Sequence, residues 1–179
     1  MDTLKMTIAG LERELPIFPI SDKVSIAAFI MFGDTEITVA AATELLKKVP
    51  EFDIILTPEA KSIPLAYEMS RQSSKPYIVA RKGPKLYMAE PFSVEVNSIT
   101  TANTQKLYLG KLEAENLKGK RILVVDDVIS TGASLIAVEA LVEKAGGTIA
   151  ASCAVLAEGD AAQRTDIVFL EPLPLIFKD

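Results

Sequence analysis

Histidine is absent from the 179 residues, and cysteine occurs once. The missing histidine excludes serine–histidine triads, histidine-rich zinc sites and histidine general bases together. The single cysteine, Cys153, cannot form a disulfide within the chain, which fits a cytoplasmic setting. Because Cys153 stands in the apolar run 150–157, we expect a buried small hydrophobe rather than a reactive thiol.

Long hydrophobic runs and basic blocks are also missing. The longest candidate, 26–32, is far shorter than the roughly 20 residues that cross a bilayer. Residues 1–10 mix charged and apolar side chains and lack the apolar centre of a signal peptide. The net charge is −5, with no cluster of Lys and Arg. We therefore expect a cytoplasmic chain with no membrane and no nucleic-acid partner.

The remaining sequence has the length and composition of one domain, 1–179. Apolar strands alternate with helical stretches, which predicts a single α/β domain with a twisted, mainly parallel sheet covered by helices on both faces. Two segments around Gly10, 4–8 and 12–18, predict an opening hairpin. The further expected strands are 53–57, 77–80, 93–99, 105–109, 121–125, 148–156 and 166–170, and the expected helices are 35–49, 64–71 and 134–145.

One segment, 121–135, carries most of the functional information. An apolar strand ends in Asp126 and Asp127, and a loop of small residues, 130–134, leads into a helix. Ligands of open α/β sheets bind at the carboxyl ends of strands, and the N–H groups of such a loop and helix N-terminus bind phosphate. Two carboxylates beside a phosphate suit the hydroxyl groups of a sugar phosphate.

Other interpretations of this segment are weaker. Two acids alone would fit an ordinary strand-to-helix turn, but the whole pattern in register favours a ligand site. A response-regulator receiver domain needs a later phospho-accepting aspartate at a strand end, and Asp160, Asp166 and Asp179 do not end apolar strands. Neither a P-loop nor a Gly-x-Gly-x-x-Gly motif occurs.

Residues 122–134 resemble the signature of type I phosphoribosyltransferases, and the likeness extends from about residue 33 onward. Segment 53–62 is similar to the pyrophosphate-binding loop of the purine members, although Lys61-Ser62 replaces their Arg-Gly or Ser-Gly. Segment 79–85 resembles the basic strand end that opens the flexible β hood loop in adenine and xanthine phosphoribosyltransferases.

The resemblance implies a glycosyltransferase of purine salvage and nucleoside metabolism. It would transfer 5-phosphoribosyl from PRPP to a purine base and release pyrophosphate, with Mg²⁺ held by substrate oxygens and water near Asp126 and Asp127 rather than by direct protein ligands. A homodimer is expected. The implied catalytic residues are Asp126, Asp127 and Glu59, and the implied substrate-binding residues are Ile129, Ser130, Thr131, Gly132, Ala133, Ser134, Ala60, Lys61, Ser62, Arg81, Lys82 and Lys85.

The acceptor base is less defined. Hypoxanthine-guanine members carry an acid where Ser130 stands, which disfavours that subclass. Adenine members carry a glutamate in the β excursion, but the matching stretch 99–105 has no acid, and the overlapping stretch 97–101 is closer to xanthine enzymes. Adenine is slightly favoured, with xanthine next. A non-catalytic PRPP- or nucleotide-binding regulator on the same fold is the alternative.

Overall fold

The centre of the molecule is a parallel sheet. The computed structural model of the chain describes residues 2–88, 90–97 and 104–177. Within them, five parallel strands lie side by side in the order β10-β9-β8-β4-β5. Their bounds are β4 Ile54–Pro58, β5 Tyr77–Ala80, β8 Arg121–Ile129, β9 Thr148–Glu158 and β10 Val168–Leu173. The predicted parallel sheet is confirmed.

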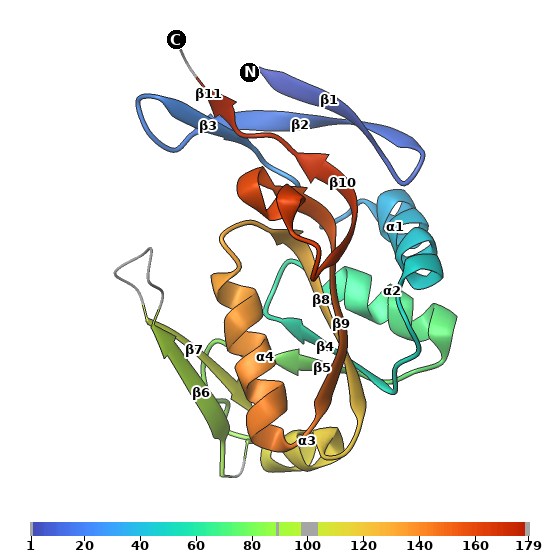
Figure 1. The fold of residues 1–179 in the computed structure, drawn as a ribbon, viewed down its shortest axis with the longest axis vertical. Helices are drawn as coiled ribbons and strands as arrows, with labels where there is room; N and C mark the ends of the chain where they lie inside the picture. Colours follow the sequence, from blue (N-terminus) through green and yellow to red (C-terminus); the bar gives the residue numbers. More distant parts are fainter. Residues whose placement is uncertain (1, 89, 98–103, 178–179) are drawn as a thin grey trace.

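Helices cover both faces of this sheet (Figure 1). Alternate residues of β8 point to opposite faces: Leu123 and Val125 join one buried cluster, and Ile122 and Val124 join another. Helices α1 and α2 supply the first cluster, and α3 and α4 supply the second. The helices are α1 Thr35–Lys48, α2 Ile63–Ser73, α3 Lys111–Leu117 and α4 Ala133–Ala145. Because the apolar side chains of β8 alternate between the two faces, helices pack on both sides, as predicted.

Local signals set the ends of the two longest helices. Asp34 caps α1, because its Oδ1 accepts a hydrogen bond from the Ile37 N–H at 3.1 Å. Gly146 ends α4 with a φ of 79°, a left-handed conformation that glycine adopts without a Cβ clash. None of the helices in the described ranges is both long and apolar enough to cross a membrane.

A second sheet stands above the carboxyl ends of the parallel strands (Figure 1). The predicted hairpin is confirmed as β1 Thr3–Ile8 and β2 Leu11–Pro19, and two strands that the sequence did not predict extend it: β3 Val24–Ala27 and β11 Ile176–Phe177. The order is β1-β2-β3-β11, so the beginning and the end of the described chain share one sheet. Arg13 of β2 joins this sheet to α1 through Asp34, with Nε 2.7 Å from Oδ2.

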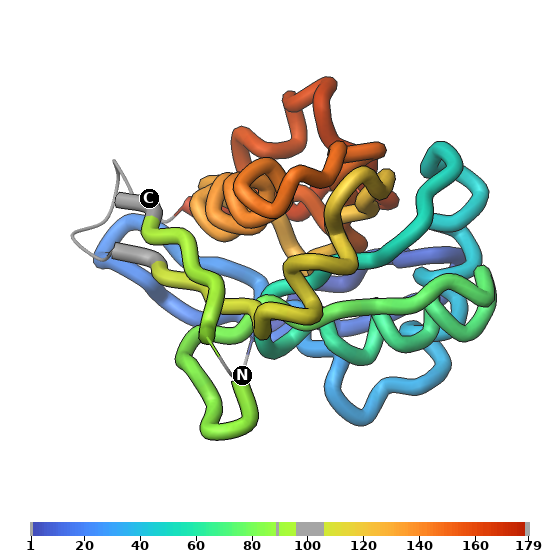
Figure 2. Tube along the Cα trace, turned by 90° about the horizontal axis from the view of Figure 1, so that it is seen from below, coloured from blue at the N-terminus to red at the C-terminus, as the bar shows by residue number. Residues whose placement is uncertain are grey.

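The predicted β excursion is a hairpin of β6 Phe92–Asn97 and β7 Thr104–Leu109. It packs against α4 and lies on the opposite side of the molecule from α1 (Figures 1 and 2). Residues 98–103 lie outside the described residues, and so does most of the stretch 99–105 that bears on base preference.

The structure corrects two sequence-based boundaries and adds one helix. Strand β8 continues through Asp126 and Asp127 to Ile129, because Asp126, Val128 and Ile129 still pair with β9. Strand β10 begins at Val168, since Asp166 instead binds Arg164. Helix α3 was not predicted. It is short, and its N-terminus is capped by Glu113, whose Oε2 accepts a hydrogen bond from the Gly110 N–H at 2.7 Å.

Candidate active site

The predicted site residues gather at one edge of the parallel sheet. Strands β4, β8 and β5 are neighbours or next neighbours, and their carboxyl ends open into the segments 59–62, 130–134 and 81–85. These segments hold all the residues to which the resemblance gave roles, apart from the β8 residues Asp126, Asp127 and Ile129. The fold therefore brings together groups that are up to 75 positions apart in sequence.

The loop after β8 forms a small polar cavity of about 170 Å³. Gly132 lies in this loop with a φ of 79° and precedes the first residue of α4, so the helix N-terminus faces the same space. The N–H groups of a helix N-terminus have no partner within the helix and favour an anion. The cavity is lined by Asp126, Val128, Ile129, Ser130, Thr131, Gly132, Ala133, Ser134 and Leu135.

The side chains of the two aspartates, Asp126 and Asp127, have different surroundings. Asp126 lines the loop cavity, whereas Asp127 is 3% exposed and meets Lys61, whose Nζ lies 2.9 Å from its Oδ2. The Lys61 ammonium is the partner of this buried oxygen, and no other donor among the described residues bonds to it. The Asp127 N–H donates to Asp126 Oδ1 at 2.9 Å, which fixes the first carboxylate.

The electrostatics also separate the acids. Burial raises the pKa of Asp126 well above its ordinary value, and the neighbouring charge of Asp127 raises it further. Lys61 acts in the opposite direction but more weakly. The Asp126 carboxylate therefore has an increased proton affinity.

Glu59 has the opposite environment. Its Oε2 accepts a hydrogen bond from the Lys82 N–H at 3.0 Å and lies 3.6 Å from Arg81 Nε. That hydrogen bond and the charges of Arg81, Lys85 and Lys82 lower the pKa of Glu59. A carboxylate held this way is a weak base, so it orders the basic segment 81–85 rather than accepting a proton.

Ser62 explains why this chain departs from the glycine of the related loops. Its hydroxyl is buried 2.7 Å from Thr57 Oγ1 and 3.2 Å from the Pro58 carbonyl oxygen. The Thr57 hydroxyl also reaches the Val125 carbonyl oxygen at 2.8 Å. These contacts lock the 59–62 loop to β4 and β8, while Lys61 beside it extends toward Asp127. The side chain of Ser62 therefore faces the protein, not the cavity.

Glu158 is a residue that the sequence reasoning missed. It ends β9, next to β8, and partial burial raises its pKa while the charge of Lys61 lowers it. The signal was present, since an acid ends an apolar strand here as at Asp126, but the predicted strand stopped two residues too early. Glu158 adds a third carboxylate around Lys61.

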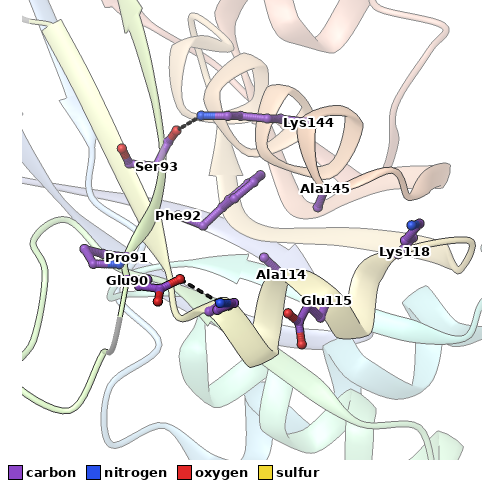
Figure 3. A pocket seen from close by; sticks show the side chains of 10 residues that line it. Glu90, Pro91, Phe92, Ser93, Ala114, Glu115, Lys118, Lys144 and Ala145 are labelled. Atoms are coloured by element: carbon purple, nitrogen blue, oxygen red, sulfur yellow. Dashed lines mark hydrogen bonds and ion pairs between the residues drawn. The ribbon is translucent and has the colours of Figure 1, made fainter.

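A larger cavity, of about 480 Å³, lies at the opposite edge of the sheet between β6, α3 and α4 (Figure 3). Two of its lysines already have hydrogen-bond partners: Lys144 Nζ donates to the Ser93 carbonyl oxygen at 2.6 Å, and Lys111 Nζ donates to Glu90 Oε2 at 2.7 Å. None of the residues with an expected role lines it. Size alone therefore does not identify the functional site.

A protein-family comparison covers all of these segments. The model of the phosphoribosyl transferase domain matches residues 32–172, which include every expected site residue. The chain belongs to the phosphoribosyl transferase family. This membership confirms the type I resemblance and, with it, the expected enzyme class of glycosyltransferases.

Two phosphoribosyltransferase relatives come from methanogens. A hypoxanthine/guanine phosphoribosyltransferase from Methanococcus voltae is 36% identical over 149 residues, 83% of this chain and 73% of the relative. One from Methanotorris igneus is 34% identical over 163 residues, 89% of this chain and 82% of the relative. These relatives do not support the expected preference for adenine.

The similar solved structures share the fold of the family. An adenine phosphoribosyltransferase from Thermoanaerobacter pseudethanolicus has a TM-score of 0.71 at 22% identity, over 88% of this chain and 95% of that one. The enzyme from Trypanosoma brucei, solved with AMP, pyrophosphate and ribose-5-phosphate, has a TM-score of 0.69 at 16% identity, over 96% of this chain and 76% of that one. At these identities the likeness concerns architecture alone.

Proposed function

We propose that the protein transfers the 5-phosphoribosyl group of PRPP to a purine base, forming a nucleoside monophosphate and releasing pyrophosphate. The observation that carries the proposal is the cavity after β8, where a loop of backbone N–H groups and the Asp126 carboxylate share about 170 Å³. That space suits a phosphate with a ribose beside it. Family membership supports the same reaction.

The chemistry needs little covalent participation by the protein. The bond from the anomeric carbon to pyrophosphate breaks, a bond to a base nitrogen forms, and the base loses a proton. The 130–134 loop would hold the 5′-phosphate, and the two aspartates would accept hydrogen bonds from the ribose hydroxyls and stabilise positive charge at the anomeric carbon. Asp126, with its raised pKa, is better suited than Glu59 to take up a proton.

The leaving group would be stabilised on the other side of β8. Lys61 forms an ion pair with Asp127. The cations Arg81, Lys82 and Lys85 follow β5, which is separated from β8 by β4. The Nε of Arg81 is buried with no hydrogen-bond acceptor among the described residues. A pyrophosphate oxygen would provide one.

Magnesium is part of the proposal. The buried Asp127 carboxylate and the adjacent Asp126 present hard oxygens, which suit a Mg²⁺ ion held nearby. Substrate oxygens and water would be the ligands of the ion, which would neutralise charge on the diphosphate when bound. Assembly as a homodimer and a cytoplasmic location stay predictions.

For the acceptor, we propose hypoxanthine or guanine. The relatives above 30% identity carry these bases in their names, whereas the adenine enzymes are similar in fold alone. The absence of an acid at Ser130 leaves adenine and xanthine as the competing acceptors, although the 99–105 stretch also lacks the glutamate of adenine enzymes.

Turnover measurements on a panel of bases test the proposal. PRPP and Mg²⁺ are mixed with hypoxanthine, guanine, xanthine or adenine, and released pyrophosphate is measured. We expect release with hypoxanthine or guanine at least about tenfold faster than with adenine, a difference of about 1.4 kcal/mol. Release with adenine alone would overturn the base assignment. PRPP binding by calorimetry without release on any base would favour the regulator.

A further inference from the structure

We propose that Arg164 is a further binding residue for the 5′-phosphate of PRPP. The inference rests on the proposed function and adds a group that no sequence motif contains. Arg164 follows the 3₁₀ helix η1 Gly159–Gln163, which connects β9 to β10 beside the loop after β8. Its guanidinium therefore reaches the phosphate loop from a separate segment of the chain.

Contact with the loop is direct. A Cβ atom placed on Gly132 would stand 2.7 Å from Arg164 Nη1, so the guanidinium lies against the Gly132 backbone on the side where any other residue would have a side chain. Gly132 has a φ of 79° and lines the 170 Å³ cavity. Glycine at this position thus permits both the loop conformation and the approach of the cation.

Asp166 holds the guanidinium in a fixed orientation. Arg164 Nε donates to Asp166 Oδ1 at 2.9 Å and Nη2 donates to Oδ2 at 2.7 Å. This two-point pair uses one edge of the fork and leaves Nη1 directed at Gly132. Nη1 makes no hydrogen bond within the residues that the structure describes, although the side chain is only 30% exposed.

Physical chemistry identifies the acceptor. Guanidinium N–H groups bind phosphate oxygens strongly, and a cation with a preset orientation loses little freedom on binding. The loop offers the phosphate neutral N–H and hydroxyl donors together with the helix N-terminus, and Arg164 would add a full positive charge. Asp166 is a positioning residue that acts through Arg164.

Another arginine of the chain provides a matched control. Arg121, at the start of β8, makes the same two-point contact with Asp53, through Nε at 3.2 Å and Nη2 at 2.9 Å. It lies at the amino end of the strand, away from the cavity. Arg121→Gln therefore removes an equivalent arginine–aspartate pair without removing a cation from the site.

The test compares ligands that contain the 5′-phosphate with one that lacks it. Calorimetry measures PRPP, ribose 5-phosphate and pyrophosphate, each with Mg²⁺, on wild type, Arg164→Gln and Arg121→Gln. We expect Arg164→Gln to weaken PRPP and ribose 5-phosphate about tenfold and to leave pyrophosphate unchanged. Arg121→Gln should leave all three affinities unchanged. Equal losses for pyrophosphate, or unchanged PRPP affinity, would overturn the inference.

Two further variants separate binding from folding. Arg164→Lys keeps the charge but loses the fork, and Asp166→Asn keeps the fork but loosens it, so each should weaken ribose 5-phosphate by a few-fold. If Arg164→Gln does not fold, an unchanged ribose 5-phosphate affinity in both of these variants would refute the role of Arg164. Failure of wild type to bind PRPP would instead refute the proposed function.

Discussion

The missing side chain of Gly132 permits both the conformation of the loop after β8 and the approach of Arg164. Its φ of 79° strains any other residue by about 1–2 kcal/mol, and Arg164 Nη1 lies only 2.7 Å from the position that a Cβ would take. We expect Gly132→Ala to fold and to bind PRPP at least about tenfold more weakly, measured by calorimetry. Gly119→Ala is the control, since Gly119 has a φ of 71° with nothing within 4 Å of its Cβ position. If both variants lost PRPP affinity equally, general strain rather than the site would be the cause.

The raised pKa of Asp126 has a consequence for stability. Below about pH 4 the carboxyl is protonated in both the folded and the unfolded chain, so it favours neither. As the pH rises toward the raised folded pKa, the unfolded chain ionises first, and the folded protein loses stability. Asp126→Asn removes this loss and keeps an oxygen to accept the Asp127 N–H.

We therefore expect Asp126→Asn to be as stable as wild type at pH 4 and about 1 kcal/mol more stable at pH 8, measured by urea unfolding. Turnover should fall at the same time, with a barrier about 2–4 kcal/mol higher. Glu115→Gln is the control and should change neither, because Glu115 is exposed and lies on α3, which precedes the amino end of β8. Glu113 would be a poor control, since it caps α3. A variant as active as wild type would remove Asp126 from the chemistry.

At the scale of elements, the segment after β5 is fixed at its start by two kinds of contact. Arg81 exchanges backbone hydrogen bonds with Tyr108 of β7, at 2.9 and 2.8 Å, and Glu59 holds the Lys82 N–H. The side chain of Arg81 is thus free to exchange Glu59 for a ligand while its backbone stays in place. Its role can be tested without dismantling the sheet.

Arg81→Ala should weaken pyrophosphate as a product inhibitor about tenfold, because a charge-assisted contact is lost. The inhibition constant of a nucleoside monophosphate, which lacks the diphosphate, should stay nearly unchanged. Lys82→Ala and Lys85→Ala should act in the same direction, and Lys75→Ala, which precedes β5, is the control. Matched losses for both ligands would indicate a collapsed segment instead.

Elements differ in how far the sequence could predict them. The parallel strands and long helices follow from local periodicity and caps such as Asp34, and the phosphate loop follows from one continuous segment. Strands β3 and β11 pair across most of the chain, so no local pattern marks them. The approach of Arg164 to Gly132 depends on the path of η1, and the paired hydroxyls of Thr57 and Ser62 depend on tertiary packing. Contacts between distant segments were the unpredictable part.

At the scale of the whole molecule, Arg13 attaches the second sheet to the start of α1. Arg13 binds Asp34 through Nε and Nη2 and Glu36 through Nη2, and the hydrogen bonds from Arg13 lower the pKa of Asp34. The same aspartate caps α1. One side chain therefore couples the N-terminal sheet to the helix that covers the parallel sheet.

Arg13→Ala should accelerate amide hydrogen exchange in β1 and β2 by about threefold or more, while β8 and β9 keep wild-type protection. The difference in exchange rate between Arg13→Ala and wild type should vanish as the pH falls through the lowered pKa of Asp34, because a protonated carboxyl no longer attracts the guanidinium. Lys5→Ala removes an exposed ion pair with Glu14 from the same hairpin and should have no effect. Uniform acceleration across both sheets would contradict this local coupling.

The pairing of β11 with β3 sets an order of events during synthesis. Strand β3 leaves the ribosome early, but its second neighbour is translated only at Ile176 and Phe177, about 150 residues later. The parallel strands and their helices are all complete before then. The nascent chain can thus assemble the catalytic sheet first, with the edge of β3 unpaired until the last strand emerges.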